Sequence, residues 1–201
     1  YLSMIGRFFR SCEFLMTTMG WGTPHGPSPL ARWRKQFHTY EVATLPGKLT
    51  VWGRFLPPAA LGRTTPEQVK ALAMSLQALS FRMQELIGAG VFHQSDLLVR
   101  VLLADVRRWR VAVQEIFGQL ANQPETAEAA SLHARLDAIL VRLEARIHEA
   151  LDKIDEARVS AEESGNMYRL LGAHRGVSEA LVDFASKTVG IDWPRLREER
   201  Y

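Results

Sequence analysis

The chain has 201 residues, of which 47% are hydrophobic and 23% are charged. This composition can build one sizeable core or two small ones, and it argues against disorder. The single cysteine, Cys12, excludes an internal disulfide and fits a reducing compartment. No stretch reaches the ~18 consecutive apolar residues of a membrane-spanning helix, and Arg7 and Arg10 interrupt any apolar segment of a signal peptide. Because the chain opens at Tyr1 in a helical pattern and without Met, we expect it to be a piece of a longer protein.

Charge is unevenly distributed along the chain, although the net charge is only +3. Residues 1–63 contain eight Lys or Arg and two acids, a net charge of +6, whereas residues 64–201 contain 17 bases and 20 acids, a net charge of −3. A basic segment that precedes an acidic one can mark contact with nucleic acid or with a membrane surface. The bases are scattered and form no run, so a solvated basic face explains them equally well.

Apolar residues at spacings of three and four predict six helices. The expected ranges are 1–20, 29–56, 66–87, 95–120, 125–161 and 166–189. The third helix has a strong start signal, with Thr65 as N-cap, Pro66 at the first helical position and Gln68 as the capping-box partner. Pro46 within the second helix predicts a kink or a short break, and residues 164–166 (Ser-Gly-Asn) indicate a turn before the last helix.

Two predicted apolar stripes matter most for the packing of these helices. The second helix should direct inward the residues Trp33, Phe37, Tyr40, Leu45, Leu49, Trp52, Phe55 and Leu56. The fifth helix has a near-heptad seam that contains Leu132, Leu136, Ile139, Leu140, Leu143, Ile147, Ala150, Leu151 and Ile154.

The predicted fold class is all-α, a bundle of about six helices arranged as long antiparallel hairpins. Period-two alternation with hairpin turns is not found in the sequence, so a β-sheet is not expected. We predict a single domain over residues 1–201, with a basic helical part at 1–63 and a bundle with a C-terminal tail at 64–201. In that tail, Trp193 and Pro194 should start a short turn or helix.

A search for catalytic chemistry gives no convincing site, and we predict no catalytic, cofactor-binding or metal-binding residue. The six histidines and one cysteine match no zinc pattern. Glu144 and His148 lie four residues apart, which is more typical of a surface pair than of half a metal site. The Gly- and Pro-rich stretch 20–29 lacks the lysine and hydroxyl of a phosphate-binding loop. Carboxylates at Asp152, Asp155, Glu156, Glu162 and Glu163 fit a solvated helix end. We therefore expect that the chain is not an enzyme.

Three further features have both a functional and a structural interpretation. Trp33 lies between Arg32 and Arg34, a basic and aromatic pattern found in nucleic-acid interfaces. The helical period should bury it, however, so no nucleic-acid partner is expected. A small-molecule pocket could use Trp33, Trp52 or Trp109, but a core explains these side chains more simply. His174 lies on an apolar stripe and is expected to be a core or hinge histidine.

Three segments of the chain resemble the fusaric acid resistance or aromatic acid exporter (FUSC-like) family of bacterial inner-membrane proteins. They are residues 1–19, with RFFRSC at 7–12, then EVATLPGKLTVWGR at 41–54 and IDWPRLREERY at 191–201. The resemblance implies a soluble cytosolic region of an efflux protein at the cytoplasmic face of the inner membrane, with a role in assembly, gating or partner contact. The basic residues 1–63 fit the excess of Lys and Arg on the inner side of membranes.

The partners implied by this interpretation are the parent membrane domain, an anionic membrane surface, other efflux components and a second copy of the chain. A homo-oligomer would bury the seam of the fifth helix or the basic first helix. The alternative is a free-standing helical scaffold or interaction module.

Overall fold

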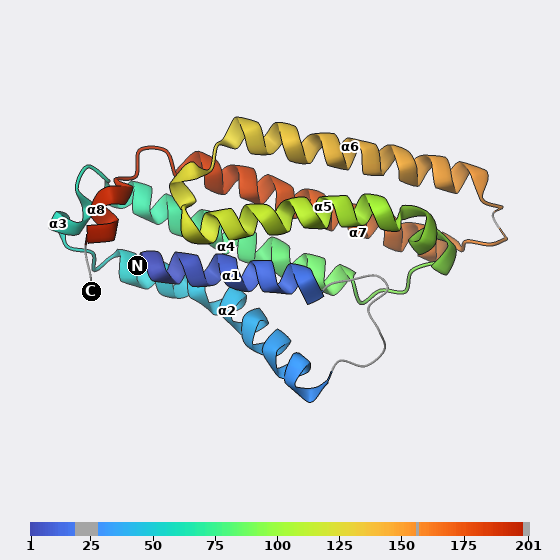
Figure 1. The fold of residues 1–201 in the computed structure, drawn as a ribbon, viewed down its shortest axis with the longest axis horizontal. Coiled ribbons are helices and arrows are strands. Elements are labelled where there is room, and N and C mark those ends of the chain that lie inside the picture. The colour runs from blue at the N-terminus through green and yellow to red at the C-terminus, as the bar shows by residue number, and fades with distance from the viewer. Residues whose placement is uncertain (19–27, 156, 199–201) are drawn as a thin grey trace.

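The computed structural model describes residues 1–18, 28–155 and 157–198, and these residues form an elongated helical bundle (Figure 1). The described elements are α1 (Leu2–Thr18), α2 (Pro29–Gly53), α3 (Pro58–Leu61), α4 (Pro66–Ala89), α5 (Asp96–Asn122), the 3₁₀ turn η1 (Pro124–Thr126), α6 (Ala129–Lys153), α7 (Ala161–Lys187) and α8 (Trp193–Glu198). The all-α bundle predicted from the sequence is confirmed, with six long helices and two short ones. The expected break across residues 20–29 falls almost wholly on 19–27, outside the described residues.

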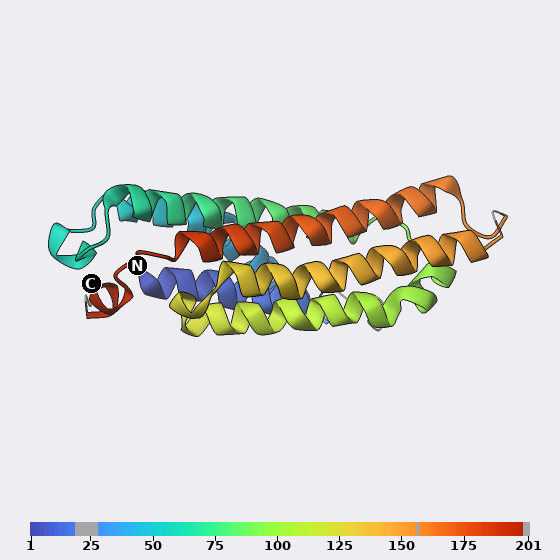
Figure 2. The same ribbon diagram turned by 90° about the horizontal axis from the view of Figure 1, so that it is seen from above.

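The six long helices form a closed ring in which every neighbour is antiparallel (Figures 1 and 2). Going around the ring, the order is α1, α5, α6, α7, α4 and α2, and α2 then packs on α1 again. The short α3 and α8 pack on each other at the end of the bundle where the described chain begins and ends. The helices of the first third of the sequence, α1 and α2, are therefore linked to α6 and α7 of the last third along both sides of the ring. The link runs through α5 on one side and through α4 on the other.

Side-chain caps fix where several helices begin. Thr65 and Gln68 form the predicted capping box at the start of α4, with Gln68 N to Thr65 Oγ1 at 3.2 Å and Thr65 N to Gln68 Oε1 at 2.8 Å. Ser95 caps α5 as expected. Each cap satisfies backbone N–H groups that have no partner inside the helix.

The predicted boundary between the last two long helices was wrong. The fifth helix was expected to reach residue 161, with a turn at 164–166, but α6 ends at Lys153 and α7 begins at Ala161. Ser160 and Glu163 form a second capping box there, with Glu163 N to Ser160 Oγ at 3.1 Å. This local start signal prevails over Gly165, which a helix tolerates at a cost of only about 1 kcal/mol.

The inward stripe predicted for α2 was right at Leu45 and Leu49, which are buried, and wrong at its large aromatic residues. Trp33, Phe37, Tyr40 and Trp52 are exposed, and Trp33 retains 61% of its accessible surface. The buried apolar residues of α2 are Val42, Leu45, Pro46 and Leu49, on the face opposite to Trp33. Both faces of α2 are apolar, so its periodicity could not determine which one faces α1 and α4. Phe55, also expected inward, lies outside α2 and is exposed.

Pro46 lies within α2 without ending the helix. A proline has no backbone N–H, so the carbonyl of Val42 loses its usual partner one turn away. The Ser80 hydroxyl of α4 donates to this buried carbonyl at 2.7 Å, and Gln84 Nε2 in turn donates to Ser80 Oγ at 3.1 Å. The carboxy-terminal half of α2 runs beside α1, whereas its amino-terminal half slants away from the bundle (Figure 1). The predicted kink is therefore present, while the alternative of a short break was wrong.

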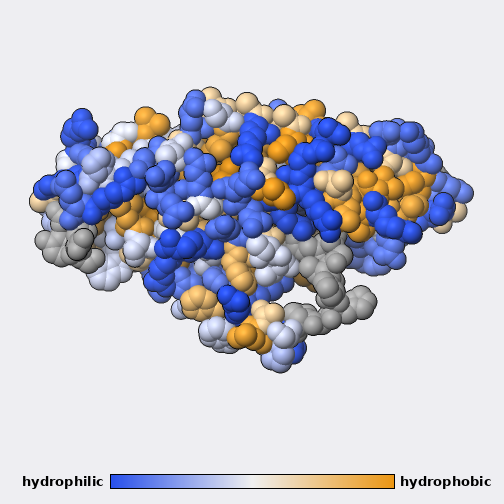
Figure 3. All heavy atoms as spheres, in the orientation of Figure 1, coloured by the Kyte–Doolittle hydropathy of each residue, from blue (hydrophilic) through white to orange (hydrophobic). Residues whose placement is uncertain are grey.

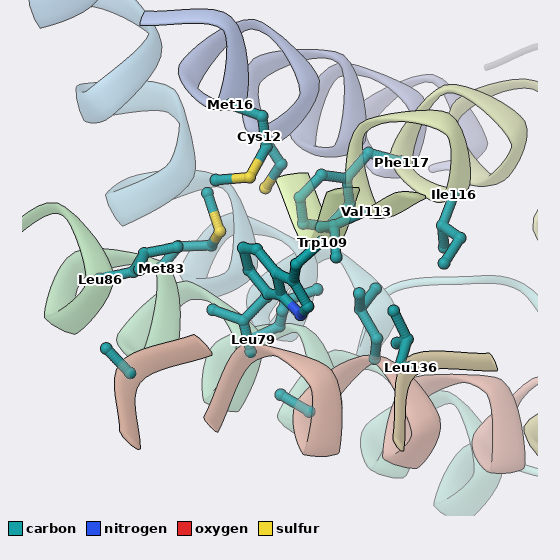
Figure 4. Packing of buried hydrophobic residues seen from close by; sticks show 14 of the residues in the cluster. Cys12, Met16, Leu79, Met83, Leu86, Trp109, Val113, Ile116, Phe117 and Leu136 are labelled. Atoms are coloured by element: carbon teal, nitrogen blue, oxygen red, sulfur yellow. The ribbon is translucent and has the colours of Figure 1, made fainter. Parts of the chain in front are cut away.

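One hydrophobic cluster includes buried residues from every helix longer than four residues. Phe9 of α1 lies at its centre, with its ring centroid 4.9 Å from that of Phe184 and 6.1 Å from that of Phe117. Figure 4 shows side chains of α1, α4, α5 and α6 converging around Trp109. Residues 1–63 and 64–201 thus pack on one another in a shared core.

The near-heptad seam of α6 is used inside the chain. Leu136, Leu140, Leu143 and Ile147 are all buried against the rest of the bundle. The apolar face of α1 is buried as well. A homo-oligomer that uses either of these two surfaces would have to open the bundle.

Among the described residues, no helix combines the length and the hydrophobicity that crossing a membrane requires.

We predict that the hydroxyl of Ser80 contributes to stability only because Pro46 is present. Ser80→Ala should lower the free energy of unfolding by about 1–3 kcal/mol, because it leaves the buried Val42 carbonyl without a donor. In a Pro46→Ala background the restored backbone amide can donate to that carbonyl, so the same substitution should cost much less. Urea unfolding of the four proteins measures this coupling.

Ser75→Ala is the matched control for that cycle. Ser75 is a buried serine of the same helix whose hydroxyl bonds to Leu72 O within α4. Its substitution should cost the same in both backgrounds. An equal cost for Ser80→Ala with and without Pro46 would show that the hydroxyl has no compensating role.

Candidate functional site

The residue pair that most resembled a metal half-site belongs to a surface network. Glu144 Oε1 lies 4.0 Å from His148 Nε2, while its other carboxylate oxygen accepts from Arg175 at 2.9 Å. His148 Nδ1 is 2.9 Å from the hydroxyl of Tyr168. Over residues 1–18, 28–155 and 157–198, no three His, Cys, Asp or Glu side chains lie close enough together to hold a metal ion.

The acidic residues near the α6–α7 connection have structural roles. Asp155 Oδ1 accepts from the backbone of Ala157 at 3.2 Å, and Glu163 completes the capping box of α7. Asp152 and Glu162 are exposed. Glu156 lies outside the described residues. The described carboxylates therefore stabilise a helix end and form no paired acid–base site.

His174 is buried, as the sequence predicted, and so is Cys12. Burial raises the pKa of the Cys12 thiol well above its ordinary value, which leaves it unreactive as a nucleophile. The Nδ1–H of His174 donates to the carbonyl oxygen of Leu170 at 2.6 Å, because that oxygen can only accept. Burial lowers the pKa of His174 to about 4, so the imidazole is neutral at pH 7.

The largest unexplained feature of the surface is the outer face of α2, which we call the basic–aromatic face. Its apolar members follow one another at helical spacing and remain exposed although they could have been used in a core. They are Leu30, Trp33, Phe37, Tyr40, Val51 and, just beyond the helix end, Phe55. Their exposed fractions run from 44% at Phe37 to 74% at Phe55. Figure 3 shows apolar side chains among pale and hydrophilic ones on this projecting part of the molecule.

The charged residues of the basic–aromatic face all have the same sign. Arg32 and Arg34 flank Trp33, and Lys48 and Arg54 follow further along. The only acid of α2, Glu41, is buried and forms an ion pair with Arg7 of α1 at 2.6 Å. The exposed surface of α2 thus combines large apolar side chains with positive charge and carries no exposed carboxylate.

Contacts within this face hold several of its side chains in place. The rings of Trp33 and Phe37 stack with centroids 5.9 Å apart. The ammonium of Lys48 lies 6.0 Å from the centroid of the Tyr40 ring, and the Arg34 guanidinium lies 5.4 Å from that of Phe14 on α1. Such cation–π pairs keep positive charge beside the aromatic surface.

The three tryptophans considered for a pocket are not brought together. Trp33 and Trp52 are exposed on α2, whereas Trp109 is buried in the core and lines a cavity. The exposure of Trp33 was missed because the sequence offered two apolar faces of α2. One signal could have found it, since residues 29–40 carry three Lys or Arg and no acid, a composition that favours an exposed helix segment.

Comparison with protein-family models, with curated proteins and with solved structures gave no match to this chain. The resemblance to the FUSC-like family therefore rests on the three quoted segments.

The titration of His174 should make the fold sensitive to mild acid. The pKa is about 4 in the folded chain and about 6.5 in the unfolded chain, so the unfolded state binds more protons between these values. The free energy of unfolding should therefore fall, by up to about 3 kcal/mol, as the pH drops from 7 to 4. Urea unfolding at several pH values measures this loss.

A non-titrating variant isolates the contribution of His174. In His174→Asn an amide can keep a donor near Leu170 O, and the pH dependence below pH 7 should become flatter than in the wild type. His133→Asn removes an exposed histidine and should leave the slope unchanged. If the free energy of unfolding of His174→Asn falls with pH as steeply as that of the wild type, His174 is not the group responsible for the pH dependence.

Proposed function

We propose that this chain is the cytosolic helical domain of a bacterial inner-membrane efflux or transport protein, and that the basic–aromatic face of α2 docks on the anionic surface of that membrane. The observation that carries the proposal is the exposure of six large apolar side chains on α2 and just beyond its end, beside four cations of the same face and no exposed acid. The resemblance of three segments to the FUSC-like family supports the same assignment.

The chemistry of the side chains fits a membrane surface. Tryptophan and tyrosine favour the boundary between lipid headgroups and acyl chains, where an apolar ring and a polar group are both satisfied. A helix that lies in this boundary has apolar side chains on one face, with Lys and Arg at its sides. Trp33, Phe37 and Tyr40 form such a face on α2, and Arg32 and Arg34 flank it.

The projection of α2 makes the face available. Between Pro29 and Tyr40 no residue is buried, so this half of the helix can lie on a surface without disturbing the core. Each base near an anionic membrane contributes about 1 kcal/mol of attraction, which is screened by salt. Four bases together with the apolar residues are enough for reversible association with lipid.

A free-standing interaction module is the second interpretation, since an exposed aromatic helix can also enter the groove of a protein partner. The uniform positive charge favours the membrane, because a protein groove for α2 would need to be both strongly acidic and strongly apolar. Nucleic acid would use the cations and stack on the aromatic rings, but it would leave Leu30 and Val51 unexplained.

Vesicle binding tests the proposal. At low salt the chain should float with vesicles that contain about one quarter phosphatidylglycerol, and binding should weaken as salt rises. Vesicles of phosphatidylcholine alone should bind much less. The triple variant Arg32→Gln, Arg34→Gln, Lys48→Gln should lose most binding to the anionic vesicles, and so should Trp33→Ala with Phe37→Ala.

A charge-matched control separates the face from net charge. Arg100→Gln, Arg107→Gln, Arg158→Gln removes three exposed cations elsewhere and should bind vesicles like the wild type. If both triple variants lose binding equally, the attraction is non-specific. Failure to bind anionic vesicles at low salt, or salt-sensitive retention on duplex DNA instead, would refute membrane docking.

A further inference from the structure

A cavity of about 190 Å³ lies where α2 diverges from the bundle. The carboxy-terminal ends of α1 and α4 and the middle of α5 contribute apolar walls, among them Met16, Leu86 and Val106. Leu170 of α7 closes another side. Exposed Lys35 lies at its rim, so the cavity reaches the surface. This volume is below the ~300–1,000 Å³ of drug-sized ligand sites, and it suits a body of about ten non-hydrogen atoms.

One wall of the cavity is fixed by hydrogen bonds. The indole N–H of Trp109 donates to Ser178 Oγ at 3.0 Å, and that hydroxyl donates to His174 O at the same distance. The rings of Trp109 and His174 lie with centroids 4.2 Å apart. These bonds use the polar atom of the indole away from the cavity, so its carbon face is an apolar wall whose position does not depend on a ligand.

Two cations from different helices line the same cavity. Arg110 of α5 is half-buried, and Lys35 projects from α2. Across the described parts of the chain, neither is in an ion pair with a carboxylate. Burial lowers the pKa of Arg110, and the nearby charge of Arg107 lowers it further. A partly desolvated guanidinium of this kind favours an anion.

We infer that this cavity binds a small amphipathic carboxylate, with its apolar body against Trp109 and its carboxylate between Arg110 and Lys35. A guanidinium can bind a carboxylate with two parallel hydrogen bonds, and an ammonium adds a second charge. The neutral imidazole of His174 adds no further positive charge, so a monoanion matches the site better than a phosphate dianion. The inference does not rest on the proposed membrane function, because none of the side chains assigned to lipid contact lines the cavity.

Titration with octanoate tests the site, since octanoate has ten non-hydrogen atoms and one carboxylate. Calorimetry below its micelle-forming concentration should give saturable binding of one molecule per chain. Octanol, which has the same apolar chain without charge, should bind at least about tenfold more weakly. Lys35→Gln and Arg110→Gln should each weaken octanoate binding by about tenfold and bring it close to that of octanol.

Two control variants test whether binding is specific to the cavity. Arg100→Gln removes an exposed cation of α5 outside the cavity and should bind octanoate like the wild type. Trp33→Ala with Phe37→Ala should also bind normally, which excludes adsorption to the basic–aromatic face. Because Lys35 is exposed, its variant remains folded even if Arg110→Gln does not. Equal affinity for octanoate and octanol, or unchanged affinity in Lys35→Gln, would overturn the inference whatever the vesicle result.

Discussion

The burial of α1 is the constraint on which the rest of the bundle depends. Ile5, Phe8, Phe9, Cys12 and Leu15 are completely inaccessible to solvent, so α1 requires partners on more than one side. Each fully buried Phe, Leu or Ile contributes about 1.5–3 kcal/mol. Its partner α2 follows it directly in the sequence, whereas its other partner, α5, lies in the middle of the chain. The helices α4, α7 and α6 then complete the ring between α2 and α5. A chain that lost α1 would leave the apolar faces of α2, α5 and α7 open to water.

This arrangement explains why α2 has apolar residues on two faces. The face with Val42, Leu45 and Leu49 packs on α1 and α4, and the half-buried ion pair between Arg7 and Glu41 joins α1 to α2. The opposite face contributes nothing to the core, although it carries the largest side chains of the helix. Folding therefore does not account for Trp33 and Tyr40 on the surface. Exposed apolar patches of this kind are a mark of interaction sites, and the membrane docking proposed above would use these two side chains.

The features that sequence reasoning predicted well are those determined locally. Helix existence and the caps at Thr65 and Ser95 depend on residues within one turn, so spacing and capping chemistry were sufficient. The orientation of α2 depends on which face meets α1, and that information lies in residues far away in the chain. The turn predicted at 164–166 failed because two local signals competed and the capping box was the stronger. Of the three tryptophans considered, only Trp109 lines the cavity. The cavity lies where α2 diverges from the bundle, and no local sequence pattern predicts such a position.

The two parts of α2 meet different physical demands. From Glu41 onward the helix is held by packing and by the Ser80 hydroxyl on the Val42 carbonyl, so substitutions there change how the chain folds. The side chains from Pro29 to Tyr40 are not part of the core. Substitutions in that part therefore change the surface of the molecule and leave the buried residues of the bundle in place. A proline in mid-helix, compensated by one hydroxyl, thus lets a single helix contribute to the core with one part and to the surface with the other.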